Sequence, residues 1–316
     1  MQTLKYGIKC FSMKAYLGID WGGTFFKAGV IDERAKLLKK EVVYSPYLKE
    51  KESFFKKIKE LLQRFSSYSL KGIGVGAPGV VNIPKGFIYY LPNISGWEKY
   101  PLKESLQRLT GLPVYVDNDA NLFALAELRL GVAKGKARVI FLTLGTGLGG
   151  AVAFEGKILK GDTSSGELGH IPITLDGKKC SCGARGCIET FVGATYLIER
   201  YRRLKKKKKE IQVREIFKKA LQGEREALVV WKEFSQSLGR FLGGMANLFN
   251  PQMIVLGGGV AGAFTLFKPL LWEVITHQAM WPHLKQLKIV RGKLKDAGII
   301  GAGILVKENL KQRREG

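Results

Sequence analysis

The chain contains the same local pattern twice: an apolar run, a glycine-rich turn and a second apolar run. The first copy occupies residues 15–31, with its turn at 22–24, and the second occupies 138–154, with its turn at 145–150. Apolar runs on both sides of a glycine turn are typical of paired β-strands. Because the pattern recurs, we expect two related lobes that face a common ligand.

Helical and strand patterns alternate around these two copies, which indicates an α/β sheet fold. The predicted strands are 72–76, 113–117 and 253–256, and the predicted helices are 53–65, 119–130, 231–249 and 300–310. The apolar stripe of 231–249 is expected to be buried and includes Leu248. We expect the last helix to fold back on the first lobe, because a lone helix must bury its apolar face. A length of 316 residues also fits two domains.

The formal net charge of +25 raises the question of a nucleic-acid partner. The lysines are spread along the whole chain, which also fits a protein adapted to heat or tuned for solubility, and we expect no nucleic acid to bind. The densest basic run, 202–209, is interpreted as a solvated helix end or loop.

No apolar run reaches the roughly 18 residues needed to cross a bilayer, so no membrane partner is expected. Residues 1–11 lack the features of a signal peptide. We therefore expect a cytoplasmic protein, whose translation starts at either Met1 or Met13.

Three glycine turns follow apolar strands and are candidates for phosphate binding. Their residues are Asp20, Gly22, Gly23 and Thr24; Gly145, Thr146 and Gly147; and Gly257, Gly258 and Gly259. Glycine lets backbone N–H groups converge on phosphate oxygens without obstruction by a Cβ. The alternative for each turn taken alone is an ordinary tight hairpin. Neither a dinucleotide fingerprint nor a Walker sequence is present, which disfavours those two classes of nucleotide site.

The segment 117–121 places polar side chains where a strand becomes a helix. Carboxylates at the C-terminal end of a strand face the crevice in which α/β proteins bind ligands. Asp119 is therefore a candidate acceptor for a proton from a substrate hydroxyl, and Asn118 a candidate partner for neighbouring hydroxyls. Helix capping is the alternative interpretation. We expect the side chain of Asp117 to point to the opposite side of the sheet from that of Asn118, so Asp117→Asn should cost far less turnover than Asp119→Asn.

Three cysteines and a histidine have the composition of a closed tetrahedral zinc site. They are His170, Cys180, Cys182 and Cys187. Such a metal would be structural, because protein fills all four positions, and it would hold Glu167 and Glu189 beside it. An exposed redox thiol cluster is the rival interpretation.

These motifs together resemble the ROK family of sugar kinases and repressors, and among them most closely its bacterial-type glucokinases. The resemblance runs from about residue 15 to about 305 and rests on both glycine turns, the polar segment 118–121 and the zinc signature. It also rests on the segments 76–79 and 166–170 and on Pro92 and Asn93 with Trp97.

The resemblance implies an actin/hexokinase-type (ribonuclease H-like) fold, with two α/β lobes and a cleft between them. We expect a smaller lobe, residues 1–118 plus 299–316, and a larger lobe, 119–298, that carries the zinc site. The resemblance also implies transfer of the γ-phosphate of ATP to a sugar, with Asp119 as the catalytic base for the 6-hydroxyl. The matching substrate-binding residues are Asn93, Asn118, Asp119, Glu167, His170 and Glu189.

On the nucleotide side, the turns at 22–24 and 145–147 match the phosphate loops, and 257–259 matches the adenosine loop. Asp20 is the candidate for orienting Mg²⁺ through water, with turn capping as its alternative role. Zinc loss is expected to weaken sugar binding more than ATP binding.

The resemblance leaves three points open. Glucose is the expected substrate, with fructose, mannose and the N-acetylated hexosamines as alternatives. The repressors of the family carry a DNA-binding module before the first glycine turn, and 19 residues precede Asp20 here, so we favour the kinase over a repressor or a sugar sensor. Relatives usually form dimers, and we expect a homodimer.

Overall fold

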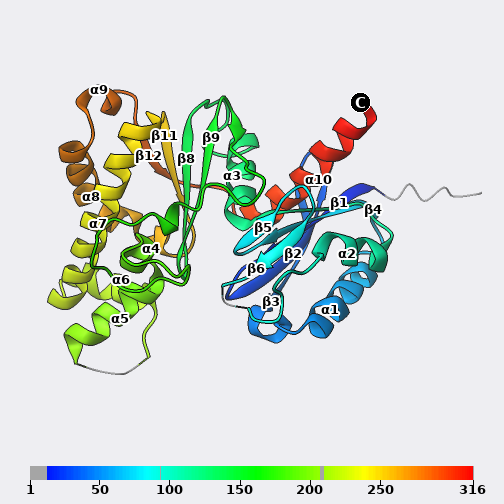
Figure 1. Ribbon diagram of the computed structural model, residues 1–316, viewed down its shortest axis with the longest axis horizontal. Coiled ribbons are helices and arrows are strands. Elements are labelled where there is room, and N and C mark those ends of the chain that lie inside the picture. Colours follow the sequence, from blue (N-terminus) through cyan, green and yellow to red (C-terminus); the bar gives the residue numbers. More distant parts are fainter. Residues whose placement is uncertain (1–12, 93, 207–209, 316) are drawn as a thin grey trace, which may run out of the picture.

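The structure, a computed structural model, describes residues 13–92, 94–206 and 210–315. Two five-stranded sheets stand side by side, and the C-terminal helix α10 (Ala297–Glu315) returns to the first of them (Figure 1). The helix α3 (Asp119–Arg129) lies between the two sheets (Figure 1).

The first sheet has the strand order β3-β2-β1-β4-β7. Its strands are β1 (Lys14–Trp21), β2 (Phe25–Asp32), β3 (Leu37–Tyr44), β4 (Ser69–Ala77) and β7 (Val114–Asn118). The strands β1 and β2 form the predicted antiparallel pair, closed by a hydrogen bond of 3.0 Å from the Gly22 N–H to the Phe25 carbonyl. The strands β4 and β7 run parallel to β1. A short pair, β5 (Val80–Asn82) and β6 (Phe87–Tyr90), lies beside this sheet.

The second sheet has the order β10-β9-β8-β11-β12, which repeats the arrangement of the first. Its strands are β8 (Val139–Leu144), β9 (Leu148–Phe154), β10 (Lys157–Ile158), β11 (Met253–Gly257) and β12 (Lys288–Arg291). Again an antiparallel meander, β8-β9-β10, is followed by two strands parallel to the first. The predicted repeat is therefore present in the topology as well as in the sequence.

Helices connect the strands and cover the sheets. The remaining helices are α1 (Lys51–Arg64), α2 (Leu102–Thr110), α4 (Glu189–Val192), α5 (Ala194–Lys205), α6 (Val213–Leu221), α7 (Arg225–Phe249), α8 (Phe264–Gln278) and α9 (Trp281–Leu284). Short 3₁₀ turns occupy Ser45–Leu48, Leu168–His170 and Val260–Ala263. None of the helices within the described residues is long and apolar enough to span a membrane.

The expected burial of Leu248 on the stripe of α7 is wrong: this side chain is 68% exposed. The other apolar residues expected on that stripe are buried, among them Trp231, Phe234 and Leu238. The helix ends at Asn250 in a left-handed conformation, and in its last turn it is Phe249 that packs against the core. The periodic spacing of apolar residues does not show where a helix extends beyond the core that it covers.

Glycines allow α10 to approach the first sheet and α3 at backbone distance. A Cβ at Gly18 of β1 would lie 2.1 Å from the Ile299 carbonyl oxygen, and one at Gly74 of β4 would lie 2.0 Å from that of Ala302. On the opposite side of α10, a Cβ at Gly301 would lie 1.9 Å from the Leu122 carbonyl oxygen of α3. The close crossing of α3 and α10 thus needs a residue without a side chain at position 301.

This crossing predicts that Gly301→Ala destabilises the protein, because the methyl group meets a backbone carbonyl that cannot move aside. We expect a loss of about 1–3 kcal/mol in the free energy of unfolding, measured by denaturant titration. The matched control is Gly244→Ala, also inside a helix, where a Cβ would meet nothing within 4 Å. The control should gain about 0.5–1 kcal/mol from the better helix propensity of alanine. Equal effects of the two substitutions would contradict the close crossing.

Candidate active site

Three parallel strands of the first sheet end side by side and bring their polar residues together. Asp20 of β1 lies opposite Gly76 of β4, which in turn lies opposite Asp117 of β7. Asn118 ends β7, and Asp119 begins α3. The predicted convergence of Asp20, Asn118 and Asp119 at one sheet edge is therefore present.

Protein atoms surround the Asp119 carboxylate, and Asp119 as a whole residue is partly exposed. Burial, with the nearby charges of Asp20 and Glu167, raises the pKa of Asp119 to about 7. The Ala120 N–H donates to Asp119 Oδ1 at 2.8 Å and opposes this increase. A carboxylate with a pKa near neutrality can both accept and release a proton under physiological conditions.

Asn118 caps α3, as the sequence suggested. Its Oδ1 accepts a hydrogen bond of 2.9 Å from the Ala120 N–H, and its Nδ2 donates to the Gly79 carbonyl at 3.2 Å. The capping interpretation is thus correct for Asn118. The two hydrogen bonds also fix its side chain next to Asp119.

Asp117 has more partners than the sequence predicted. Its Oδ1 accepts from the Asn118 N–H and from Asn121 Nδ2, both at 2.8 Å, and its Oδ2 pairs with Lys160 Nζ at 2.7 Å. The side chain is 2% exposed. Both oxygens of Asp117 accept hydrogen bonds, and in Asp117→Asn one of them becomes an NH₂ group that cannot accept. Asp117 is therefore a poor comparison for Asp119, and we expect its substitution to reduce stability.

The first glycine turn leaves two amides free for a ligand. The Gly22 N–H closes the turn, whereas the N–H groups of Gly23 and Thr24 have no protein acceptor within the part of the chain that the structure describes. The buried residue Ser45 stabilises the turn through two hydrogen bonds. Its Oγ donates to the Gly22 carbonyl at 2.5 Å, and its N–H donates to the Thr24 carbonyl at 2.9 Å.

Asp20 faces a cation already supplied by the chain. Lys27 Nζ lies 3.4 Å from Asp20 Oδ2. Burial raises the pKa of Asp20, the charge of Lys27 lowers it, and that of Asp296 raises it. The ion pair with Lys27 already compensates the charge of Asp20, so a second cation at this carboxylate would compete with Lys27.

The second and third glycine turns lie next to each other in the second sheet. Gly257 pairs with Thr143, and a Cβ at Gly258 would lie 2.3 Å from the Leu144 carbonyl oxygen. In the second turn the Gly145 N–H donates to the Gly147 carbonyl at 3.0 Å. The amides of Thr146 and Gly147 donate to no protein acceptor among the described residues, as at Gly23 and Thr24 in the first turn.

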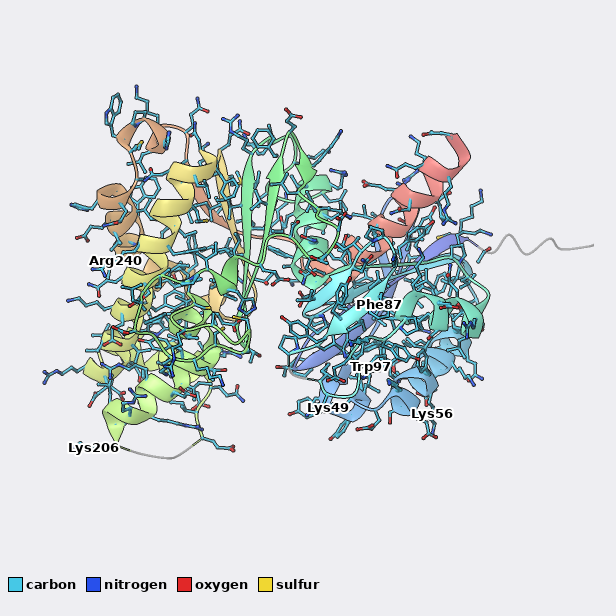
Figure 2. The ribbon with its side chains drawn as sticks, viewed as in Figure 1. Lys49, Lys56, Phe87, Trp97, Lys206 and Arg240 are labelled. Atoms are coloured by element: carbon cyan, nitrogen blue, oxygen red, sulfur yellow. The ribbon has the colours of Figure 1, made fainter. Side chains whose placement is uncertain are left out.

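Asn93 lies outside the described residues, but the segment that follows it is firmly anchored. Trp97 is fully buried and lies 4.7 Å, centroid to centroid, from Trp21, the last residue of β1 before the first glycine turn. Its indole N–H donates to the Lys49 carbonyl at 2.6 Å, and Figure 2 shows these two residues close together. Trp97 thus fixes the far end of the segment to the first turn.

Glu167 and Glu189 form an acidic pair beside the cysteine cluster. Burial and the charge of Glu189 raise the pKa of Glu167 to about 7. Glu189 Oε2 accepts from the Leu148 N–H at 3.0 Å, and Oε1 accepts from Ser181 Oγ at 3.3 Å. The sequence indicated these glutamates beside the cluster but gave no sign that one of them reaches the second glycine turn.

The four predicted metal ligands come together: their ligand atoms all lie within 4.8 Å of one another. Cys180 Sγ is 3.4 Å from His170 Nδ1, and Cys182 Sγ is 3.7 Å from Cys187 Sγ. A tetrahedral ion with bonds of about 2.3 Å to sulfur and about 2.0 Å to nitrogen places its ligands about 3.5–3.8 Å apart. The donor set and these two distances therefore fit zinc.

Four residues of the site escaped sequence reasoning: Ser45, Lys160, Lys27 and Ser164. Ser164 Oγ accepts from the Val81 N–H at 3.0 Å and so links the second lobe to the first. Of the four, only Lys27 had a usable signal, because the hairpin register places it opposite Asp20. The other three meet their partners through tertiary packing alone.

Two α/β lobes with the same topology, each with a glycine turn after its first strand, and a carboxylate at the edge of the first sheet define the actin/hexokinase-type fold of sugar kinases. A family model described as ROK family matches residues 16–309, and the chain belongs to this family. The predicted family and fold class are confirmed.

Relatives in this family include both enzymes and regulators. The glucokinase of Thermotoga maritima is 34% identical over 310 residues, which cover 93% of this chain and 98% of that protein. The crystal structure of a ROK family glucokinase from Streptomyces griseus in complex with glucose and AMPPNP matches with a TM-score of 0.82 and 29% identity, over 93% of this chain and 99% of that one. The crystal structure of a ROK family transcriptional regulator, a homologue of the Escherichia coli Mlc protein, matches with a TM-score of 0.84 and 25% identity. The match covers 94% of this chain and 78% of that one.

The raised pKa of Asp119 predicts a pH-dependent effect of Asp119→Asn on stability. Between about pH 4 and 7 the folded protein binds more protons at this group than the unfolded chain, so the group contributes less to stability as the pH rises. The variant lacks this titration. Its free energy of unfolding relative to wild type should therefore increase between pH 5 and pH 8, measured by denaturant titration.

The matched control is Asp162→Asn, at an exposed position, which should show the smaller change with pH. A difference between wild type and Asp119→Asn that stays constant from pH 5 to pH 8 would contradict the raised pKa.

Proposed function

We propose that the protein is an ATP-dependent hexose kinase that transfers the γ-phosphoryl group of ATP to the 6-hydroxyl of glucose. The observation that carries this proposal is the Asp119 carboxylate at the sheet edge, next to Asn118 and close to the charge of Asp20, with a pKa of about 7. The likeness to glucokinases over nearly the whole chain supports glucose as the sugar. Other hexoses and N-acetylhexosamines remain alternatives, because their hydroxyls are similar.

In the proposed reaction, the 6-hydroxyl oxygen forms a bond to the γ-phosphorus while the bond from phosphorus to the β,γ-bridging oxygen breaks. Asp119 accepts the hydroxyl proton, and ADP leaves with the electron pair of the broken bond. Asn118, already fixed as the helix cap, and Glu167, His170 and Glu189 would hold the other sugar hydroxyls. Asn93 is proposed as a further sugar contact.

On the nucleotide side, the free amides of the first two turns are proposed to hold phosphate oxygens, as the family resemblance implies. The turn at 257–259, beside the second turn, would contact the adenosine. Mg²⁺ would neutralise phosphate charge, and Asp20, at the end of the strand that leads into the first turn, would orient it.

We also propose that His170, Cys180, Cys182 and Cys187 bind a structural zinc ion. All four positions are filled by protein, so the ion would stabilise the segment 166–189 and not activate water. The lobe boundaries 1–118 plus 299–316 and 119–298, the homodimer, the cytoplasmic location and the lack of a nucleic-acid partner all remain predictions.

The likeness to a transcriptional regulator supports one alternative function, a sugar-responsive protein without catalysis. Such a protein would bind the sugar with the same residues and would not turn over ATP. The two functions are separated by one assay.

The kinase proposal predicts ADP release that depends on sugar, with the highest kcat/KM for glucose in a panel of hexoses and hexosamines. Asp119→Asn should lower kcat by about 10²–10⁴-fold, because the amide cannot accept the proton, and should leave glucose affinity within a few-fold. Asp162→Asn is the control. Glucose binding without any sugar-dependent ADP release would favour the regulator.

The zinc proposal predicts one zinc ion per chain by metal analysis, and its loss in Cys182→Ser. The variant should also melt at a lower temperature, because the segment 166–189 loses its crosslink. Ser181→Ala, between two of the ligands, should keep its zinc. A full zinc content in Cys182→Ser would show that the cluster is not the metal site.

A further inference from the structure

The backbone of Leu148, the first residue of β9, is held from two sides by residues next to the metal ligands. Its N–H donates to Glu189 Oε2 at 3.0 Å, and Glu189 follows the ligand Cys187 by two positions. Its carbonyl oxygen would lie 2.0 Å from a Cβ at Gly169, the residue before the ligand His170. Both contacts therefore link the Cys/His cluster to the end of the second glycine turn.

The turn itself is shaped around Glu189. A Cβ at Gly147 would lie 2.0 Å from Glu189 Oε2, so only glycine fits at that position while the carboxylate stays in place. Further contacts come from the start of α5: the Ala194 N–H donates to the Gly145 carbonyl at 2.9 Å, and Thr195 Oγ1 donates to that of Thr146 at 3.3 Å.

The two carboxylate oxygens of Glu189 contact different parts of the site: one contacts the second glycine turn, and the other contacts the Cys/His cluster. Oε2 accepts from Leu148, whereas Oε1 accepts from Ser181 Oγ at 3.3 Å and lies 3.7 Å from Cys180 Sγ. By taking the Leu148 amide, Glu189 leaves the amides of Thr146 and Gly147 as the free donors of the turn. A turn with amides fixed in this way binds phosphate without a cost of ordering.

We propose that Glu189 is a positioning residue that couples the Cys/His cluster to the second glycine turn, so that the metal state of the cluster controls nucleotide affinity. The inference rests on the proposed function, because it takes the second turn as the phosphate site. It adds an effect on the nucleotide to the expectation that zinc loss weakens sugar binding more than ATP binding, which stays a prediction. Glu189 keeps its proposed sugar contact, and the link to Leu148 operates without sugar.

The test is a double-mutant cycle read out by calorimetric binding of AMPPNP with Mg²⁺ and without sugar. Gly147→Ala should weaken binding about tenfold or more in the wild-type background, because the methyl group and the carboxylate cannot both be accommodated. In the Glu189→Ala background the same substitution should cost less than about threefold, because the carboxylate is gone. Glu189→Gln should bind within about threefold of wild type, because its amide oxygen can still accept from Leu148.

The metal arm uses the same readout. Removal of zinc with a chelator should weaken AMPPNP binding by wild type about tenfold and by Glu189→Ala much less, because that variant has already lost the link. Glu199→Ala, an exposed glutamate on α5 that pairs with Lys178, is the matched control and should respond to the chelator as wild type does. Thermal melts of each variant establish that it is folded.

Three outcomes decide the matter. Non-additive effects of Gly147→Ala and Glu189→Ala support the coupling. Additive effects, or an AMPPNP affinity that does not respond to zinc removal, overturn it and leave the proposed kinase intact. Failure of wild type to bind AMPPNP at all overturns the proposed function and the coupling together.

Discussion

The fold buries the carboxylate of Asp119, which makes its ionised form unfavourable. Several neighbouring groups of the site raise or lower its pKa further. Burial and the nearby charge of Asp20 oppose ionisation, whereas the Ala120 N–H and the N-terminal end of α3 favour it. The balance sets a pKa near neutrality. The same carboxylate in water would ionise near pH 4 and would be a weaker base at neutral pH.

The position of Asp119 depends in turn on the crossing of α3 and α10. Glycines at 18, 74 and 301 let α10 approach the first sheet and α3 at backbone distance, and α3 carries Asp119 at its first turn. At the other end of α3, Arg129 pairs with Glu308 of α10 at 2.5 Å. The last helix of the chain therefore fixes the orientation of the helix on which the candidate base lies.

Sequence reasoning predicted the parts that follow from local patterns. These parts are the hairpins, the repeat, the cap at Asn118 and the cluster of metal ligands. Each depends on residues that are close together in the sequence, or on a pattern that occurs twice in it. It could not predict Lys160 beside Asp117, Ser45 behind the first turn or Glu189 on the Leu148 amide, because those contacts join segments far apart in the chain. Leu248 is a different error: the apolar spacing of α7 predicted its burial, but the helix extends beyond the core at this residue and the side chain is exposed.

The pH dependence of kcat/KM for glucose, measured with saturating ATP and Mg²⁺, tests the central claim most directly. If Asp119 is the base, kcat/KM falls tenfold per pH unit on the acid side, with a midpoint near pH 7, because protonation of this one carboxylate abolishes proton acceptance. The residual activity of Asp119→Asn should lack this acid limb. A profile that stays flat down to pH 5, or an acid limb that persists in Asp119→Asn, would contradict the account.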